Sequence, residues 1–196
     1  MAQQVLRAYN NIIKSQETEI KMERNRNLLT NNCNMQGIRP IMVDLPYPPI
    51  QARGRNPRYA ELLMVDYCGS VSELSAILQY INNENRMSDE HCSLIRTILG
   101  IAMAEMIHLQ KLGELIHLLG GNVCFEAKQP DGLWSPSCLT LPDHIPQMLQ
   151  ADIDAEKAAI RQYKIHINAI QDDLVNDVLR RIILDEEYHI MILQSL

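Results

Sequence analysis

Two Glu-x-x-His motifs are the part of this sequence best suited to chemistry. The first runs from Glu105 to His108 and the second from Glu186 to His189. Residues three positions apart share a face of an α-helix, so each motif would present one carboxylate and one imidazole to a common point. Oxygen and nitrogen donors without a thiolate suit iron or manganese better than structural zinc. The pair of motifs therefore indicates a metal site.

A third motif with the same spacing begins at Glu114 and shows that spacing alone is not enough. Glu105 and Glu186 each stand in the middle of an apolar stripe, whereas Glu114 follows Gln110 and Lys111. Glu114 also lies about 180° around a helix from Glu105, at about 100° per residue. We therefore assign the third motif to a solvent-facing surface.

Two further glutamates stand among apolar neighbours in the segments that precede the motifs. They are Glu73 and Glu156, and a tyrosine follows each of them seven positions later, Tyr80 and Tyr163. The order glutamate, tyrosine, Glu-x-x-His thus occurs twice. Such an internal repeat would bring four carboxylates and two imidazoles to one level of a helical bundle.

Four buried carboxylates need cations nearby. An ionised carboxylate buried without a partner costs several kcal/mol, and four together would also repel one another. The helices offer few buried cations, whereas two divalent ions would balance four negative charges and leave the histidines as neutral donors. The sequence predicts two iron or two manganese ions per chain, since both metals accept these donors. The predicted ligands are Glu73, Glu105, His108, Glu156, Glu186 and His189.

Four stretches with helical periodicity are available to position these residues. They cover residues 58–85, 88–120, about 143–170 and about 173–194. Gly69 predicts a kink or a small-residue contact in the first stretch, and Ser88 predicts an N-cap for the second. Residues 121–141 read as a long connection, and no stretch alternates with period two for long enough to form a sheet. The predicted fold class is all-α, a four-helix bundle with one long crossover between its second and third helices.

The N-terminal region has a different character. Residues 2–29 show weak helical periodicity, and five of the nine prolines lie in residues 40–57, which predicts an extended segment. We therefore expect an arm over residues 1–45, followed by the bundle over residues 46–196.

Composition excludes several classes of function. The chain has 196 residues, enough for one substantial domain, and a formal net charge of −6. The excess of acid gives no general attraction for nucleic acid or for an anionic membrane. No apolar run approaches the roughly 20 residues that cross a bilayer, and the N-terminus does not resemble a secretory signal. The five cysteines form no CxxC pair, which favours free thiols in a reducing cytoplasm.

Several segments resemble a known family. NPRYAELLMVDYCGSVSELSAILQY and IAMAEMIHLQKLGELIHLLGG resemble the first two helices of manganese catalases, while DIDAEKAAIRQY and ILDEEYHIMIL equally resemble helices of bacterioferritin or rubrerythrin. Over about residues 46–194 the chain is thus similar to the ferritin-like superfamily and, within it, to short relatives of manganese catalase. The resemblance implies a ferritin-like bundle that binds two metal ions and assembles as a homo-oligomer.

The resemblance also implies roles for particular residues. Glu105 would bridge the two ions together with Glu156 or Glu186. Glu186 would act either as a ligand or as a proton acceptor beside the metals. Apart from the resemblance, the symmetric placement of Tyr80 and Tyr163 in the repeat favours a role through hydrogen bonds to the site, and the alternative is that they are plain core tyrosines.

Two departures from the family bear on the reaction. Ala159 stands where rubrerythrin-like proteins carry an additional glutamate, and no rubredoxin-like cysteine site is present in the sequence. Without such an electron donor, disproportionation of hydrogen peroxide is favoured over its reduction by an external reductant. Full manganese catalases continue well past the fourth helix, whereas this sequence ends seven residues after His189, which weakens the expectation of catalase activity.

The leading hypothesis is therefore a cytoplasmic dinuclear iron or manganese redox protein that acts on hydrogen peroxide or dioxygen. The first alternative is a ferroxidase or iron-handling protein, and the second is a structural, spore-coat-like bundle with a vestigial metal site. Hydroxylation of an RNA nucleotide on the same scaffold is disfavoured by the acidic balance.

Overall fold

The computed structural model describes Lys14 and residues 33–87, 89–127 and 133–196. Contacts divide the chain into two units, Met1–Cys33 and Asn34–Leu196. The predicted helix over residues 2–29 and the predicted N-cap at Ser88 lie outside the described residues. The division into an arm of residues 1–45 and a bundle of residues 46–196 stays a prediction.

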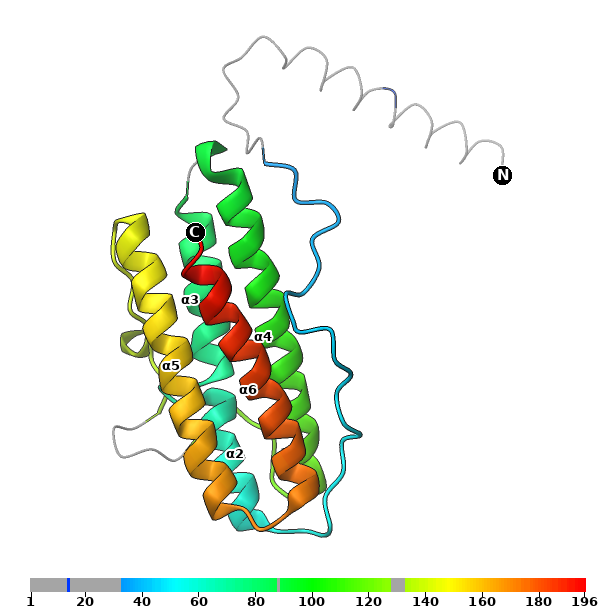
Figure 1. Ribbon diagram of the computed structural model, residues 1–196. Helices are drawn as coiled ribbons and strands as arrows, with labels where there is room; N and C mark the ends of the chain where they lie inside the picture. Colours follow the sequence, from blue (N-terminus) through cyan, green and yellow to red (C-terminus); the bar gives the residue numbers. More distant parts are fainter. Residues whose placement is uncertain (1–13, 15–32, 88, 128–132) are drawn as a thin grey trace, which may run out of the picture. The chain divides into compact units, whose positions relative to one another are not determined.

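The second unit is a bundle of α-helices that run roughly parallel or antiparallel to one another (Figure 1). The helices are α2 (Pro57–Cys68), α3 (Glu73–Asn85), α4 (Cys92–Leu118), α5 (Ile145–Ala169) and α6 (Asp173–Leu193). Helices α2 and α3 lie end to end and together form the first helical element of the bundle. Two short 3₁₀ turns, Asp89–His91 and Pro136–Cys138, lie in the connections. The described residues contain no strand. The predicted all-α bundle with a long crossover between α4 and α5 is confirmed.

The first predicted helix, residues 58–85, is divided into α2 and α3 at Gly69 rather than kinked there. Gly69 ends α2, and its N–H donates to the Val65 carbonyl at 2.8 Å. Ser72 then caps α3, because its hydroxyl accepts a hydrogen bond from the N–H of Ser75 at 3.2 Å. Glu73 thereby becomes the first residue of α3. The positive end of a helix dipole stabilises a carboxylate at that position.

An extended segment, residues 34–56, precedes α2 and runs beside α4 and α6 (Figure 1). Its prolines prevent a helix, and it is fixed to the bundle through its backbone. Near its start, the Ile41 N–H donates to the carbonyl of Gly100 at 2.9 Å, and at its end the Asn56 N–H donates to the carbonyl of Leu119 at 2.9 Å. The segment is therefore part of the bundle's surface.

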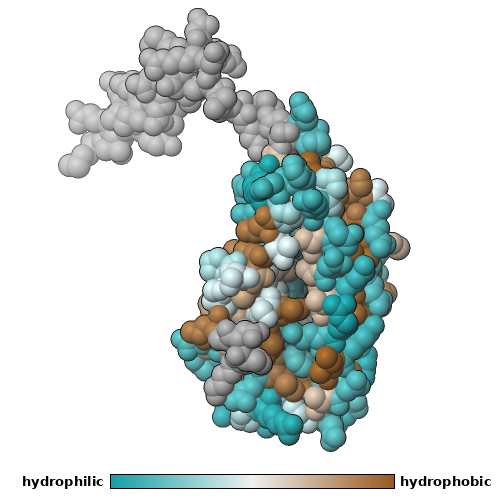
Figure 2. Space-filling view, turned by 90° about the vertical axis from the view of Figure 1, so that its left-hand side faces the viewer, coloured by the Kyte–Doolittle hydropathy of each residue, from teal (hydrophilic) through white to brown (hydrophobic). Residues whose placement is uncertain are grey.

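The core consists of two hydrophobic layers with a polar level between them. One layer contains Leu112, Leu115, Leu179 and Ile182, and the other contains Ile98, Ile101, Ile153 and Leu193. Along α4, the residues between the two layers include Glu105 and His108. Along α6, they include Glu186 and His189. The polar level is thus enclosed above and below by hydrocarbon. On the outer face seen in Figure 2, by contrast, hydrophobic and hydrophilic side chains are interspersed.

Among the described residues, α4 is long and apolar enough to cross a membrane by length and composition alone. Its apolar residues Ile98, Ile101 and Leu112 are buried within the bundle, as in the core helix of a globular domain. One expectation from the sequence, about the cysteines, needs correction. Cys33 and Cys92 are disulfide-bonded, whereas Cys68, Cys124 and Cys138 are free. The expectation of free thiols is therefore wrong for two of the five cysteines.

Candidate metal centre

The six predicted ligands meet in the polar level as two overlapping groups of four. The first quartet is Glu73, Glu105, His108 and Glu186, and the second is Glu105, Glu156, Glu186 and His189. Within each quartet, the donor atoms all lie within 4.8 Å of one another. None of the six side chains is more than 3% exposed. Helices α3, α4, α5 and α6 each contribute at least one of these side chains. Glu105 and Glu186 belong to both quartets.

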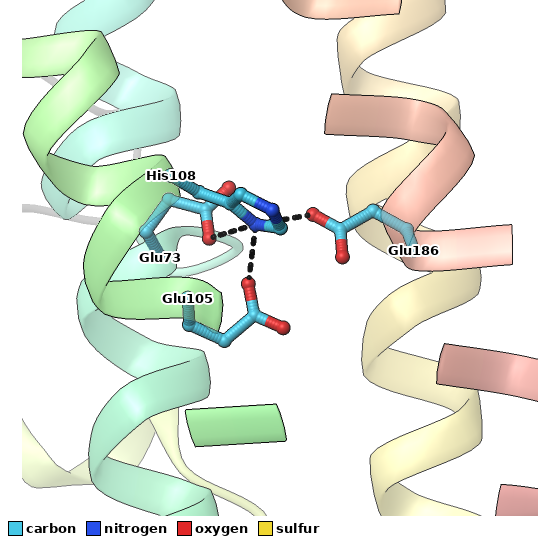
Figure 3. Close-up of side chains that lie close together, drawn as sticks. All are labelled: Glu73, Glu105, His108 and Glu186. Carbon is cyan, nitrogen blue, oxygen red and sulfur yellow. Dashed lines mark hydrogen bonds and ion pairs between the residues drawn. The ribbon is translucent and has the colours of Figure 1, made fainter. Parts of the chain in front are cut away.

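In the first quartet, the imidazole of His108 faces three carboxylates. Its Nδ1 lies 2.8 Å from Glu105 Oε2 and 3.3 Å from Glu186 Oε1. The same nitrogen lies 3.5 Å from Glu73 Oε2. Figure 3 shows Glu186 reaching across from α6 toward the three residues of α3 and α4.

The second quartet repeats this arrangement around His189. Its Nδ1 lies 2.9 Å from Glu105 Oε1 and 3.1 Å from Glu186 Oε2. It also lies 3.4 Å from Glu156 Oε1. Glu105 and Glu186 therefore direct one oxygen toward each histidine, so each of them could contribute a ligand atom to both quartets.

Several buried atoms of the two quartets have no hydrogen-bond partner. They are Glu105 Oε1, both carboxylate oxygens of Glu186, and His189 Nδ1. Buried polar atoms are rarely left unpaired, because each one costs about 1–3 kcal/mol. All of these atoms are good donors to a divalent cation of the iron or manganese type. The residues present therefore fit a pair of such ions.

The charges of the polar level shift the pKa values of its groups strongly. Burial and the neighbouring carboxylates raise the pKa of Glu73 and of Glu156 well above the usual range. Burial lowers the pKa of His108 and His189, but the surrounding carboxylates outweigh it and raise both values well above normal. Burial opposes ionisation of Glu105, yet the two histidines lower its pKa overall. Without metal, the site therefore holds protons that a metal must displace.

Binding of Mn²⁺ or Fe²⁺ near neutral pH is accordingly expected to release several protons per chain, because ligands bind metals in their deprotonated form. Calorimetric titrations in buffers with different ionisation enthalpies would measure the number. A heat of binding that does not depend on the buffer would contradict the expectation.

Two tyrosines hold the carboxylates that are not shared between the quartets. The hydroxyl of Tyr80 donates to Glu156 Oε1, and the hydroxyl of Tyr163 donates to Glu73 Oε1. Burial and the nearby carboxylates raise the pKa of both phenols. Each tyrosine is therefore a neutral donor that orients a glutamate of the opposite half of the repeat.

The third Glu-x-x-His motif lies outside the site, as expected. The side chain of Glu114 is 40% exposed and lies 3.7 Å from Lys111 Nζ. It also accepts a hydrogen bond from Gln110. Its histidine, His117, is exposed.

Sequence reasoning missed the residues that surround the imidazoles. Asp185 is fully buried, and its Oδ2 lies 3.2 Å from His108 Nε2. Arg181 is a buried cation, contrary to the expectation that the helices offer few, and its Nη1 lies 2.7 Å from Asp185 Oδ1. The available signal was an arginine and an aspartate four residues apart within an apolar stripe. Because they pair with each other, Arg181 does not neutralise the four glutamates.

A cavity of about 350 Å³ reaches the polar level between α3 and α5. It touches all four glutamates of the quartets, and small side chains including Ala76, Ala155 and Ala159 form part of its wall. Exposed Asp154 and Thr140 and half-buried Cys138 line it as well. The cavity is large enough for small molecules to approach the carboxylates.

Comparison with known proteins agrees with the geometry. A family model described as "Ferritin-like domain" matches residues 71–196. A protein of Clostridium acetobutylicum named "Probable manganese catalase" is 32% identical over 73 residues, which are 37% of this chain and 32% of that protein. The matched part thus spans about a third of the relative's length.

Solved structures show the same bundle. The manganese catalase KatB from Anabaena PCC7120 superimposes with a TM-score of 0.71 and 25% identity, over 78% of this chain and 76% of that chain. The bacterioferritin of Rhodobacter capsulatus superimposes with a TM-score of 0.61 and 21% identity, over 72% and 84% of the two chains. At that lower identity the second likeness shows the fold alone.

Proposed function

The chain belongs to the ferritin-like domain family, and from that premise we propose that its polar level binds two manganese or iron ions and carries out redox chemistry on hydrogen peroxide. The observation that carries the proposal is the pair of buried quartets that share Glu105 and Glu186. The similarity to two manganese catalases supports the choice of substrate.

A pair of these ions, when bound, supplies a two-electron couple that can oxidise one peroxide molecule to dioxygen and reduce another to water. The chain's own residues do the rest. Glu73 and His108 would hold one ion and Glu156 and His189 the other, while Glu105 would bridge them. The two unpaired oxygens of Glu186 favour a second bridging ligand over a separate proton acceptor.

Tyr80 and Tyr163 would keep the terminal carboxylates in place through their hydroxyl donors. The cavity between α3 and α5 would admit peroxide. The hydrocarbon layers on either side of the polar level would exclude bulk water from the rest of the site.

Oxidation of Fe²⁺ by dioxygen or peroxide is the second candidate function. The same donor set accepts iron, and bacterioferritins share the bundle. A purely structural role is less well supported, because the four buried glutamates would then be balanced only by the two histidines that face them.

Metal content and two activity measurements separate these functions. We expect about two manganese or iron ions per chain in protein purified without chelator, and oxygen evolution when hydrogen peroxide is added. Rapid Fe²⁺ oxidation without oxygen evolution from peroxide would favour iron handling instead. Fewer than one ion per chain would count against any enzymatic role.

Narrowing the cavity should slow the reaction without removing the metals. Ala159→Leu places a larger side chain on the cavity wall, and we expect oxygen evolution to fall about tenfold or more, because a misplaced substrate of even 1 Å can cost about 100-fold. Ala158→Leu is the matched control, since Ala158 is similarly half-buried on α5 but is not part of the wall. Equal rates in the two variants, or loss of metal from Ala159→Leu, would contradict this route.

We also propose that the protein forms a homo-oligomer, with no nucleic acid or membrane as partner. The acidic balance supports the absence of nucleic acid. Exposed hydrophobic side chains on α5 and α6, including Ile165 and Met191, offer contact area to a second copy. Light scattering would give the number of subunits.

A further inference from the structure

We propose that residues 41–47 of the extended segment, here called the strap, are a working part of the metal centre because they set the proton position on both ligand histidines. This inference rests on the proposed function. The strap precedes every helix of the bundle, yet it contacts the outer nitrogen of one imidazole directly and of the other through a single carboxylate.

The contact with His189 is direct. Its Nε2 lies 2.7 Å from the main-chain carbonyl of Ile41. A carbonyl oxygen only accepts hydrogen bonds, so the proton of a neutral ring must reside on Nε2. The lone pair of Nδ1 then points toward the carboxylates of the second quartet, where a metal would bind.

The contact with His108 passes through Asp185. The Oδ2 atom of Asp185 faces His108 Nε2 at 3.2 Å and accepts from the Tyr47 hydroxyl at 2.8 Å. The Oδ1 atom accepts from the Val43 N–H at 2.8 Å and pairs with Arg181 Nη1 at 2.7 Å. The strap thereby fixes the carboxylate that fixes His108.

Arg181 attaches the strap to α6 more generally. Its guanidinium donates to the carbonyls of Val43 and Leu45 at 2.8–3.0 Å. It also lies over the ring of Tyr47, 4.5 Å from the ring centroid. The arginine is thus used twice, once to hold the strap and once to orient Asp185.

The internal repeat explains why the strap carbonyl is needed. Asp185 immediately precedes Glu186, and its carboxylate faces Nε2 of His108, the histidine of the other motif. The equivalent position before Glu105 is Ala104, which is fully buried and has no side-chain acceptor. The carbonyl of Ile41 supplies, from outside the helices, the acceptor that Ala104 lacks for His189.

Gly100 allows the strap to come close enough. The N–H of Ile41 donates to the Gly100 carbonyl at 2.9 Å. A Cβ atom at Gly100 would lie 2.9 Å from two side-chain atoms of Ile41 and 3.1 Å from the carbonyl oxygen of Arg39. A larger residue there must therefore displace the Ile41 side chain and crowd the Arg39 backbone, so we expect it to loosen the contact between the strap and α4.

Asp185→Asn tests the strap's effect on His108, because the hydrogen-bond donors around Asp185 fix the orientation of the new amide. The Val43 N–H and Arg181 are donors only, so the amide oxygen must take the Oδ1 position. The amide N–H₂ then faces His108 Nε2 and makes it an acceptor, which moves the ring proton to Nδ1. We expect binding of one of the two ions to weaken about 100-fold, the upper end for outer contacts of a metal ligand.

The control for this variant is Asp177→Asn. Asp177 lies on the same helix and pairs with an arginine, Arg180, at 2.7 Å, but both side chains are more than half exposed. Binding of both ions should be unchanged in this variant.

Gly100→Ala tests the other half of the strap. We expect about tenfold weaker binding of the ion at the second quartet, together with faster hydrogen exchange of the Ile41 and Val43 amides in the metal-free protein. Gly113→Ala is the matched control on the same helix, because its Cβ would meet nothing nearer than 3.4 Å. It should leave both properties unchanged.

Zn²⁺ is a suitable diamagnetic probe for calorimetry and for ¹⁵N NMR of the histidine rings. Wild-type protein should bind two Zn²⁺ ions, with metal on Nδ1 and a proton on Nε2 of both His108 and His189. Asp185→Asn or Gly100→Ala protein that binds both ions like wild type, or metal on Nε2 in wild type, would overturn the strap's role and leave the proposed function intact. Wild-type protein that binds no metal would overturn the proposed function itself, and the strap's role with it.

Discussion

Glu105→Gln is expected to remove both metal ions, and with them all peroxide chemistry. Glu105 belongs to both quartets, and its two oxygens face the two imidazoles at 2.8 and 2.9 Å. An amide carries no charge, and its N–H₂ group would direct a donor at one histidine where a metal should bind. Metal analysis after dialysis should show less than one ion per chain. The loss of metal affinity should exceed the about 10–100-fold that results from changing a residue that only hydrogen-bonds to a ligand.

Glu114→Gln is the control that this sequence itself provides. It makes the same substitution in the same helix and in the same three-residue relation to a histidine, but on a half-exposed side chain. We expect full metal content and full activity. Equal retention of metal by the two variants would mean that the buried quartets are not the binding site.

Removing the metals is expected to lower the thermal stability of the protein by about 10 °C, and the loss should grow with pH. Ligand binding at a free concentration about 1,000 times Kd contributes about 4 kcal/mol, and each kcal/mol shifts Tm by about 2–4 °C for a domain of this size. The pKa shifts give the direction of the pH dependence.

In the metal-free protein, Glu73, Glu156, His108 and His189 have raised pKa values. Their contribution to stability is complete below the unfolded values, about 4.3 for glutamate and 6.5 for histidine, and is lost as the pH rises through the folded values. Glu105 has a lowered pKa, so its contribution is lost only in acid. Stability of the metal-free protein should therefore fall from pH 6 to pH 9.

The loaded protein should behave differently, because metal ligands bind better once deprotonated. Thermal unfolding with excess Mn²⁺ and with chelator, at several pH values, would measure the gap between the two states. Parallel curves over this pH range would contradict the proton-holding site. Glu105→Gln provides a second check, since added Mn²⁺ should scarcely raise its Tm.

The fold and the meeting of the six side chains could be predicted because both depend on spacing within helices. Glu105 and His108 share a face wherever their helix lies, and an acid within an apolar stripe must turn inward with it. The doubled pattern then brings the two halves to one level. The structural separation of Glu114 from the site follows from the same periodicity.

The remaining features depend on contacts between distant parts of the chain. The prediction of one continuous helix over residues 58–85 was wrong, because Ser72 caps a new helix. Hydrophobic periodicity does not show where such a local hydrogen bond ends one helix and starts another. The strap could not be found from spacing, because its main contribution to His189 is a backbone carbonyl, and every residue has one. Arg181 and Asp185 were visible in the sequence, but their contacts with the strap, which help to bury both, were not.

The two histidines meet different acceptors, a carboxylate for His108 and a carbonyl for His189. A carboxylate draws the Nε2 proton more strongly and makes the imidazole a better electron donor to its metal. If two ions bind as proposed, they would therefore be inequivalent: we expect the one beside His108 to bind first and to give up an electron more easily. Partial loading would then create an ordered half-filled state, into which a different second metal could be introduced to make a heterometallic pair.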